Sequence, residues 1–323
     1  MTPGPDFSVV IPTYNRAAHV APCLAPFLEP GAAGIDVTVV DDGSTDDTEA
    51  RVLEAAANSR GARIRYLRQA NAGPGVARNT GAAQALQPWI LFLDVDDRWM
   101  SWTIDMVRRA LAEAADAAML FLQTRNFVTD AELDGAVQAP LRLLRHEGFL
   151  AFDKERPMQT YGSCNVGIRW EAFDAVGGFE PTIRCAEDVD LFYRLDASGT
   201  VLSALGSDLV GYRLNSEGSL SANPDRMREG LDFLERGLDE GRYPAPAEAL
   251  RLLMNRRRRL WVQIYFGRGM VKAPYDLLLP DAPKRIRRMG AVEWGKLVLT
   301  PLLTLVRPSR YHFGWRAMLV GGR

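Results

Sequence analysis

Three carboxylates stand within four positions, directly after the apolar run at residues 89–93: Asp94, Asp96 and Asp97. An apolar run of this length, preceded by a proline, indicates a strand that is buried on both faces. Open α/β sheets bind their ligands beyond the carboxyl ends of such strands. Adjacent carboxylates repel one another, and a hard cation such as Mg²⁺ or Mn²⁺ would relieve that repulsion and would favour a phosphorylated substrate. The alternative is a solvated acidic turn before a helix that starts near Ser101 or Trp102.

A second acidic group follows the apolar run at residues 35–40. Asp46 and Asp47 suit the first turn of a helix that Ser44 or Thr45 caps and that runs on through residue 57. Helix chemistry does not explain Asp41 and Asp42, which end the preceding strand beside Gly43. We therefore expect a binding role for this pair, with a purely structural role as the alternative.

A third acidic group opens the helix predicted at residues 185–195, with Glu187, Asp188 and Asp190 near its start. The helix dipole favours acids at this end. Asp190 and Arg194 are four residues apart, which predicts an ion pair on the helix surface or against the sheet. By contrast, the glycine pair at 73 and 75 is no dinucleotide fingerprint, because Arg78 stands where the third glycine is required.

Strand and helix patterns alternate from residue 7 to residue 122, which predicts an α/β fold with a mostly parallel sheet of the nucleotide-binding kind. Residues 123–160 show no clean period, and we expect short helices there around 141–145 and 149–152. The remaining expected strands are at 7–11, 64–67, 117–122, 201–205 and 209–214, with a turn followed by a strand at 162–169. The remaining expected helices are at 17–28, 103–115 and 170–176, with one ending near 86 and mostly helical structure from 225 onward.

The net charge of −1 hides a split between two parts of the chain. From Arg251 onward there are 16 Lys and Arg against 3 Asp and Glu, whereas the preceding part has 23 against 37. Cationic blocks at 256–259 and 284–288 lie beside Trp261 and Trp294, as in helices that lie in the interface of an anionic membrane. The alternative is that the apolar stripes pack on the acidic body and the arginines are solvated. No nucleic-acid recognition motif accompanies the charge, so we expect no nucleic-acid partner.

Three cysteines without paired spacing predict a reducing compartment, with neither a disulfide framework nor a zinc site. The first residues have no signal-peptide pattern, and no stretch reaches the roughly 18 apolar residues of a spanning helix. We expect a cytoplasmic location, with association with the inner face of the cell membrane as a further possibility. The expected domains are a catalytic domain at 1–222 and a helical basic extension at 223–323, which would contribute to the acceptor site, contact a membrane surface or form an oligomer contact.

Six short motifs occur along the chain in a characteristic order. Through these motifs the chain resembles the family 2 inverting glycosyltransferases with a GT-A fold. The resemblance covers residues 7–221, and the number, order and spacing of the motifs make it specific. The motifs are VIPTYNR at 10–16, VDDGSTD at 40–46, GVARN at 75–79, FLDVDD at 92–97, VGGF at 176–179 and EDVDL at 187–191.

The resemblance implies a nucleotide site and a metal site at these motifs. Asp42 would accept a hydrogen bond from the N–H of a uracil ring. Arg78 would line the nucleotide site, although it could instead pair with one of the acids. Asp94, Asp96 and Asp97 would approach Mn²⁺ or Mg²⁺, and the sequence leaves open which of them binds it. The full implied nucleotide set is Pro12, Thr13, Tyr14, Arg16, Asp42, Gly75, Arg78, Asp94, Val95 and Asp96.

The resemblance also makes Asp188 the catalytic base, with Glu187 beside it. We therefore expect a metal-dependent inverting transferase that moves a sugar from a nucleotide-sugar, expected to be a UDP-sugar, to a hydroxyl of a glycan or lipid-linked acceptor. A nucleotidyltransferase shares a similar sheet, but the loop after the first strand lacks its Gly-rich basic signature. The other alternative is a non-catalytic sugar-nucleotide or glycan-binding partner of a glycan-assembly complex, against which the complete acidic motifs argue.

One departure from the family pattern concerns the metal or diphosphate. Many relatives have Tyr-Arg-x-His near the end of the domain, whereas this chain has Asn215 in place of the histidine. The three histidines of the chain, His19, His146 and His312, are dispersed and predict no metal cluster. If that histidine assists the metal or the diphosphate, its absence implies that another group or water takes over.

Overall fold

The computed structural model describes residues 6–155, 161–214 and 223–267, without the side chains of 259, 260 and 262–267. It divides the chain into two compact units. Unit 1 comprises the chain up to Arg213 together with Arg242–Ala245, and unit 2 comprises Leu214–Gly241 and the chain from Pro246 onward. The cationic block at 284–288, the apolar stretch that begins at Trp294, Asn215 and His312 lie outside the described residues.

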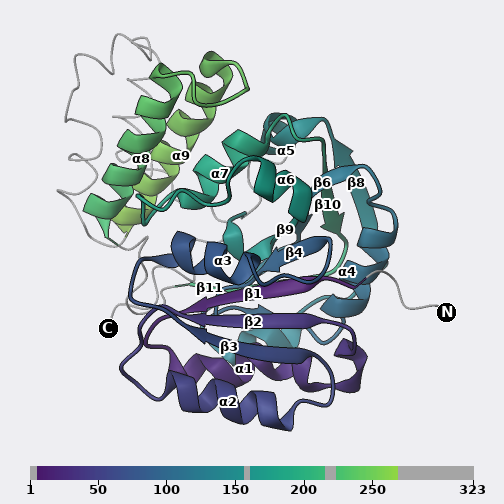
Figure 1. The fold of residues 1–323 in the computed structure, drawn as a ribbon. Helices are drawn as coiled ribbons and strands as arrows, with labels where there is room; N and C mark the ends of the chain where they lie inside the picture. The colour runs from purple at the N-terminus through teal and green to yellow at the C-terminus, as the bar shows by residue number, and fades with distance from the viewer. Residues whose placement is uncertain (1–5, 156–160, 215–222, 268–323) are drawn as a thin grey trace. The chain divides into compact units, whose positions relative to one another are not determined.

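Unit 1 is built on an eight-stranded sheet of order β3-β2-β1-β4-β9-β6-β10-β8 (Figure 1). The pairs β3–β2, β2–β1, β1–β4 and β6–β10 are parallel. Strand β9 runs antiparallel to both of its neighbours, and β8 runs antiparallel to β10. The strands are β1 (Ser8–Thr13), β2 (Asp36–Asp41), β3 (Arg63–Arg68), β4 (Trp89–Phe92), β6 (Ala117–Leu122), β8 (Arg142–His146), β9 (Val166–Arg169) and β10 (Thr200–Leu205). The expected mostly parallel α/β architecture is confirmed.

Helices cover both faces of this sheet, and the alternating side chains of β1 show why. Val9 and Ile11 belong to the same core as Leu24 and Phe27 of α1 (Ala17–Leu28). On the opposite face, Val10 lies against Gly81 of α3 (Pro74–Ala82). A strand buried on both faces needs apolar residues at every position, which explains the continuous apolar run. The other helices of unit 1 are α2 (Thr48–Asn58), α4 (Thr103–Ala112), α5 (Gly148–Glu155), α6 (Trp170–Ala175) and α7 (Glu187–Leu195), with single turns η1 (Pro30–Ala32), η2 (Asp130–Gly135) and η3 (Ser163–Asn165).

The sheet register brings three loops to one edge. Thr13 pairs with Asp41 at the ends of β1 and β2, and Val10 pairs with Phe92 of β4. Because these strands are parallel, the loops that follow them leave the sheet at the same edge. The antiparallel β9 starts beside Phe121 of β6, so the segment before it, Ser163–Asn165, also lies at this edge.

The structure corrects some of the expected local elements. The segment around 141–145, expected as a short helix, instead belongs largely to the edge strand β8 at 142–146, which pairs with β10. A second sheet, of order β5-β11-β7, contains the short strands β5 (Arg98–Trp99) and β7 (Thr124–Phe127), which were not predicted, and β11 (Val210–Arg213). The expected caps of α2 are also wrong, because the helix begins at Thr48 and its N-cap residue is Asp47, which makes no side-chain cap bond; the Thr48 N–H donates instead to Asp46 Oδ1 at 3.1 Å.

Unit 2, as far as it is described, consists of α8 (Pro224–Asp239) and α9 (Ala247–Gly267). The Asn223 side chain caps α8 by accepting hydrogen bonds from the N–H groups of Asp225 and Arg226. Arg258, in the cationic block of α9, is buried and pairs with Glu235 of α8 at 2.7 Å. No helix among the described residues is long and apolar enough to cross a membrane.

Candidate functional site

The loop after β4 carries the three expected carboxylates in three different environments. Asp94 pairs with Arg78 at 2.6 Å. Asp97 is 2% exposed, and its Oδ1 accepts a hydrogen bond of 2.8 Å from the backbone N–H of Arg213. The Asp97 Oδ2 atom is buried, and no hydrogen-bond partner for it exists in the described part of the chain. The Asp96 carboxylate is partly exposed and has no hydrogen bond to a described residue, whereas its backbone carbonyl accepts one of 3.0 Å from Arg213 Nε.

Burial makes this loop electrostatically unfavourable without a cation. Burial raises the pKa of Asp94 against the opposing effect of Arg78. Burial and the neighbouring Asp96 and Asp94 raise the pKa of Asp97 well above its usual range. The Cys164 thiol lies close by, and one ligand atom each of Asp94, Asp97 and Cys164 fall within 4.8 Å of one another.

The residues of this loop fit a hard divalent cation. The orphaned Oδ2 of Asp97 and the carboxylate of Asp96 are oxygen ligands of the kind that Mg²⁺ and Mn²⁺ prefer. A thiol is a soft ligand, so we assign the carboxylates rather than Cys164 to such an ion. No histidine belongs to the possible ion-binding group found in the described residues.

Arg78 connects the carboxylate loop to α7. Its guanidinium is buried and donates hydrogen bonds to Asp94 Oδ1 at 2.6 Å and to Glu187 Oε1 at 2.8 Å. It also lies over the ring of Phe179, 5.3 Å from the centroid. Of the two sequence interpretations of Arg78, this geometry is that of the ion pair with the acids.

The two acids at the start of α7 differ in what they contact. Glu187 is buried, its partner is Arg78, and burial raises its pKa. Asp188 is partly exposed, and its Oδ1 accepts a hydrogen bond of 2.8 Å from the backbone N–H of Val189. Its Oδ2 has no partner among the described residues, and a Cβ placed on Gly162 would lie 3.2 Å from it. The glycine therefore keeps one side of this carboxylate oxygen open.

The backbone immediately before these acids is strained. Ala186, which precedes α7, has a left-handed conformation with φ of 62°. For a residue with a Cβ this costs about 1–2 kcal/mol, and such residues persist only where the surroundings hold them. The start of α7 is therefore fixed by side-chain contacts rather than by the preference of its own backbone.

The expected nucleotide-binding residues lie along the ends of β1 and β2. Asp42 is buried and accepts hydrogen bonds of 2.8 Å from Gln69 Nε2 and from the N–H groups of Ala72 and Gly73. Two of these bonds go to Oδ1 and one to Oδ2, so Oδ2 keeps acceptor capacity. Asp41 turns the other way and accepts from the Ser44 N–H and the Tyr66 hydroxyl, both at 2.7 Å, which is a structural role.

The other members of the expected nucleotide set are spread over the same edge. Tyr14 is 48% exposed, as a residue that packs on a base requires, and the buried Thr13 Oγ1 has no partner in the described ranges. Gly75 approaches α7 and its preceding loop so closely that an added Cβ would lie 3.3 Å from Cβ of Phe179. The remaining members are Pro12 in β1, Arg16 before α1, and Val95, which is buried between the carboxylates.

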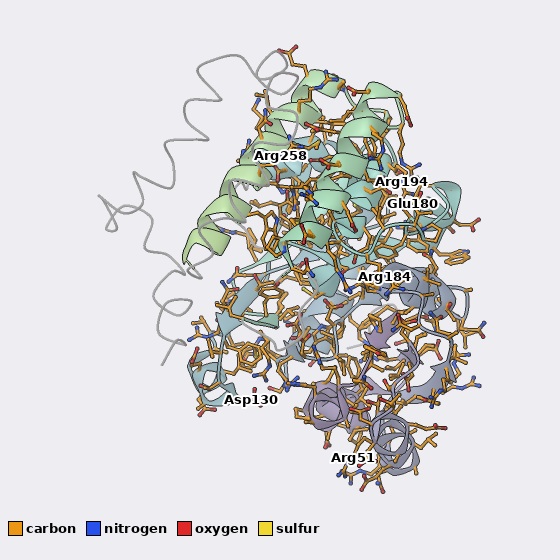
Figure 2. All side chains as sticks on the ribbon, turned by 90° about the vertical axis from the view of Figure 1, so that its left-hand side faces the viewer. Arg51, Asp130, Glu180, Arg184, Arg194 and Arg258 are labelled. Atoms are coloured by element: carbon orange, nitrogen blue, oxygen red, sulfur yellow. The ribbon has the colours of Figure 1, made fainter. Side chains whose placement is uncertain are left out.

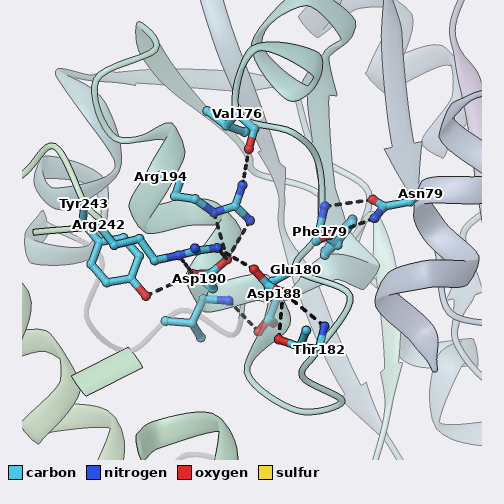
Figure 3. Close-up of polar contacts among 11 residues, drawn as sticks. Asn79, Val176, Phe179, Glu180, Thr182, Asp188, Asp190, Arg194, Arg242 and Tyr243 are labelled. Atoms are coloured by element: carbon cyan, nitrogen blue, oxygen red, sulfur yellow. Dashed lines mark hydrogen bonds and ion pairs between the residues drawn. The ribbon is translucent and has the colours of Figure 1, made fainter. Parts of the chain in front are cut away.

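A cluster around Asp190 was only partly predicted. The expected pair with Arg194 is confirmed at 2.6 Å, but Asp190 is 0% exposed rather than on the helix surface. Arg242 Nε at 3.0 Å and the Tyr243 hydroxyl at 3.0 Å also donate to Asp190 Oδ1 (Figure 3). No local sequence signal could reveal these two residues, because about 50 positions separate them from Asp190. Figure 2 shows Arg194 and Glu180 near one another in unit 1.

Arg213 holds the carboxylate loop from β11. Besides its bonds to Asp96 and Asp97, it donates to the Val128 carbonyl at 3.0 Å, pairs with Asp130 and lies 4.4 Å over the Phe127 ring. The arginine of the family motif at 212–213 thus has a clear structural role in this chain.

Comparisons with known proteins agree with this geometry. A sequence profile described as "Glycosyl transferase family 2" matches residues 8–176, more than half of the chain. An uncharacterized glycosyltransferase of Rickettsia felis is 33% identical over 235 residues, and the match covers 69% of this chain and 35% of that protein. The putative teichuronic acid biosynthesis glycosyltransferase TuaG of Bacillus subtilis is 25% identical, over 73% of this chain and 89% of TuaG. The chain thus spans about a third of the length of its Rickettsia relative and most of the length of TuaG.

The fold also matches solved structures. TarS of S. aureus, residues 1–349 in complex with UDP-GlcNAc, superposes with a TM-score of 0.62 at 19% identity, covering 97% of this chain and 87% of that one. The mannosyltransferase PcManGT of Pyrobaculum calidifontis, in complex with GDP-Man and Mn²⁺, gives a TM-score of 0.55 at 15% identity, with 99% and 86% covered. The expected GT-A fold is confirmed. Because the family profile matches more than half of the chain and curated glycosyltransferases are similar to it, the chain belongs to glycosyl transferase family 2.

Proposed function

We propose that this protein is a metal-dependent inverting glycosyltransferase that moves a sugar from a nucleotide-sugar to a hydroxyl of a glycan or lipid-linked acceptor. One observation carries the proposal. Asp188 presents an open carboxylate oxygen beside Glu187, and Arg78 joins Glu187 to the loop of Asp94, Asp96 and Asp97. One buried guanidinium thus links the residue beside the candidate base to the loop of the candidate cation site.

In this mechanism Asp188 takes the proton of the acceptor hydroxyl as its oxygen attacks the anomeric carbon. General-base catalysis of this kind contributes on the order of 10²–10⁴ in rate. The attack comes from the side opposite the leaving nucleoside diphosphate, so the configuration inverts. A divalent cation bound by the carboxylates of the loop would offset the charge that develops on the leaving diphosphate. No protein acid is then needed to protonate the leaving group, and Glu187 keeps its role as the partner of Arg78.

For the donor we propose a UDP-sugar and for the cation Mn²⁺ or Mg²⁺. The spare acceptor capacity of Asp42 Oδ2 suits the N–H of uracil. The structure of TarS with UDP-GlcNAc supports a UDP-sugar as the donor, and that of PcManGT with GDP-Man and Mn²⁺ supports Mn²⁺ as the cation. Because PcManGT was solved with GDP-Man, a GDP-sugar is the alternative donor.

We also propose that a catalytic domain ending near residue 222 is followed by a basic extension at 223–323 that contacts an anionic surface. The support is the excess of 16 basic over 3 acidic residues from Arg251 onward. A membrane surface that presents a lipid-linked acceptor fits this charge.

The decisive test is a thermal-shift panel of UDP, GDP, dTDP and CMP, each with and without Mn²⁺. A ligand at 100 times its Kd adds about 2.7 kcal/mol of stability. We expect a manganese-dependent shift with UDP. Asp188→Asn should keep that shift and lower donor turnover by on the order of 10²–10⁴. If none of the four nucleotides shifts the unfolding temperature, the transferase proposal fails and the binding-partner hypothesis gains weight.

A further inference from the structure

We propose that Asp190, Arg242 and Tyr243 form a positioning cluster that fixes the first turn of α7, and thereby sets the direction of Asp188. The inference rests on the proposed role of Asp188 as the base. None of the three residues is assigned a part in the chemistry: Asp190 lies two positions after Asp188, and the other two reach it from a segment far along the chain (Figure 3).

The contacts on Asp190 are numerous for one side chain. Its Oδ1 accepts from Arg242 Nε and the Tyr243 hydroxyl, both at 3.0 Å, and its Oδ2 accepts from Arg194 Nε at 2.8 Å. Asp190 is 0% exposed and Tyr243 is 7% exposed. A buried carboxylate is tolerated when its acceptor positions are filled in this way, and each bond then resists displacement of the helix turn that carries it.

The cluster also ties α7 to the loop before it. Arg242 donates to Glu180 Oε2 at 2.8 Å, and Arg194 donates to the Val176 carbonyl at 2.6 Å. The segment Arg242–Ala245 belongs to unit 1 although the chain on both sides of it belongs to unit 2. These polar contacts anchor the segment in unit 1, together with the Tyr193 and Tyr243 rings, whose centroids lie 5.5 Å apart.

The start of α7 needs such anchors because it follows a strained residue. Ala186 is in the left-handed region, and Glu187 and Asp190 flank Asp188 on its two sides. Arg78 holds Glu187, and the cluster holds Asp190. The remainder of α7 is fixed by buried apolar residues, namely Leu191, Phe192 and Leu195. Loss of a cluster bond should therefore shift the first turn, and Asp188 with it, while the rest of the helix stays packed.

The test compares Tyr243→Phe and Arg242→Gln with the unaltered protein, using UDP release from UDP-GlcNAc with Mn²⁺ and water as the acceptor. A displacement of about 1 Å at a reacting group can cost on the order of 100-fold in rate. We expect kcat to fall about tenfold or more in each variant, within that range. The KM for UDP-GlcNAc and the Kd for UDP with Mn²⁺ should stay unchanged, because the variants do not touch the nucleotide residues.

Two further variants separate positioning from general loss of stability. Val52→Ala removes methyl groups from a fully buried side chain of α2, so it should lower the unfolding temperature and leave kcat unchanged. Ala186→Gly removes the backbone strain before α7, since glycine adopts positive φ readily. Added to Tyr243→Phe, it should restore at least part of the lost kcat.

The inference is overturned if Tyr243→Phe and Arg242→Gln keep full kcat, if KM rises in step with the loss, or if Ala186→Gly restores nothing. If the proposed role of Asp188 as the base is wrong, the result is different: UDP release is then as fast in Asp188→Asn as in the unaltered protein.

Discussion

At the scale of single residues, the acids of the site are distinguished by their partners. Glu187 and Asp94 share Arg78, Asp190 accepts from Arg242 and Tyr243, and Asp188 and Asp96 keep open oxygens. The sequence predicts that acids gather here, because strand ends and helix starts are local features. The motif singles out Asp188 as the base, but no local pattern shows that Glu187 pairs with Arg78 or that Gly162 lies beside Asp188, since both of these residues are distant in the chain.

Replacing Arg78 by methionine should strongly destabilise the protein. The change leaves Asp94 and Glu187 without their cation, and breaking a buried pair in this way costs about 3–5 kcal/mol. Urea unfolding followed by far-UV circular dichroism measures the loss. Arg145→Gln, which breaks the exposed pair with Asp116, is the matched control and should leave the midpoint unchanged. Equal midpoints for Arg78→Met and the unaltered protein would contradict the structural role of Arg78.

His19 should make the protein less stable in mild acid. Burial and the nearby Arg213 lower the pKa of His19 from its usual 6.5. The unfolded chain therefore takes up a proton below pH 6.5 that the folded protein does not, so stability is lost as the pH falls from 6.5 through the lowered pKa. His19→Gln should reduce the loss of unfolding free energy between pH 7.5 and pH 5.5. An unchanged pH dependence in this variant would show that His19 titrates normally.

At the scale of elements, segments with a clear local pattern could be predicted, including the short helix α6, whereas segments whose conformation depends on strand pairing could not. Residues 17–28 were predicted as a helix in spite of Pro22 and Pro26, and α1 has these bounds. Residues 141–145 were expected as a helix but form β8, because pairing with β10 decides the conformation of an edge segment whose own pattern is weak. The two-residue β5 exists through its pairing with β11, which no local pattern encodes.

Gly81→Ala should destabilise α3, although alanine is the better helix former by about 1 kcal/mol. An added Cβ would lie 2.4 Å from Val10 Cγ1 and 3.0 Å from Val40 Cγ2, and overpacking of this kind costs about 1–3 kcal/mol. Differential scanning calorimetry should show a lower unfolding temperature. Gly31→Ala, where no atom lies within 4 Å of the added Cβ, is the control and should not lower it. A rise in the Gly81→Ala variant would mean that α3 can move away from the sheet at little cost.

At the scale of the whole molecule, charge is distributed unevenly along the chain. The family motifs lie in the acidic part, and the excess of basic over acidic residues is found from Arg251 onward. The family and the fold could be predicted from the acidic part because its motifs are local. The acceptor could not, since no motif of the chain indicates its chemistry and residues 123–160 show no clear period.

The basic extension leads to a prediction about membranes. The protein should sediment with vesicles that contain phosphatidylglycerol and not with pure phosphatidylcholine vesicles. Each basic residue near an anionic surface contributes about 1 kcal/mol, and salt screens the attraction. Binding should therefore weaken between 50 mM and 500 mM NaCl. Equal sedimentation with both kinds of vesicle, or with neither, would argue against an electrostatic membrane contact.

The antiparallel strand β9 has a consequence for synthesis. By the time Phe92 has been made, strands β1 to β4 can pair with one another, but β4 meets its other neighbour only when residues 166–169 emerge. Strand β6 also pairs with residues 166–169, and its other neighbour, β10, is made later still. During this interval β4 has one edge without a partner and β6 has two, and such apolar edges associate readily with other chains. A nascent chain that stops before residue 166 should therefore be the form most prone to aggregate and most dependent on chaperones.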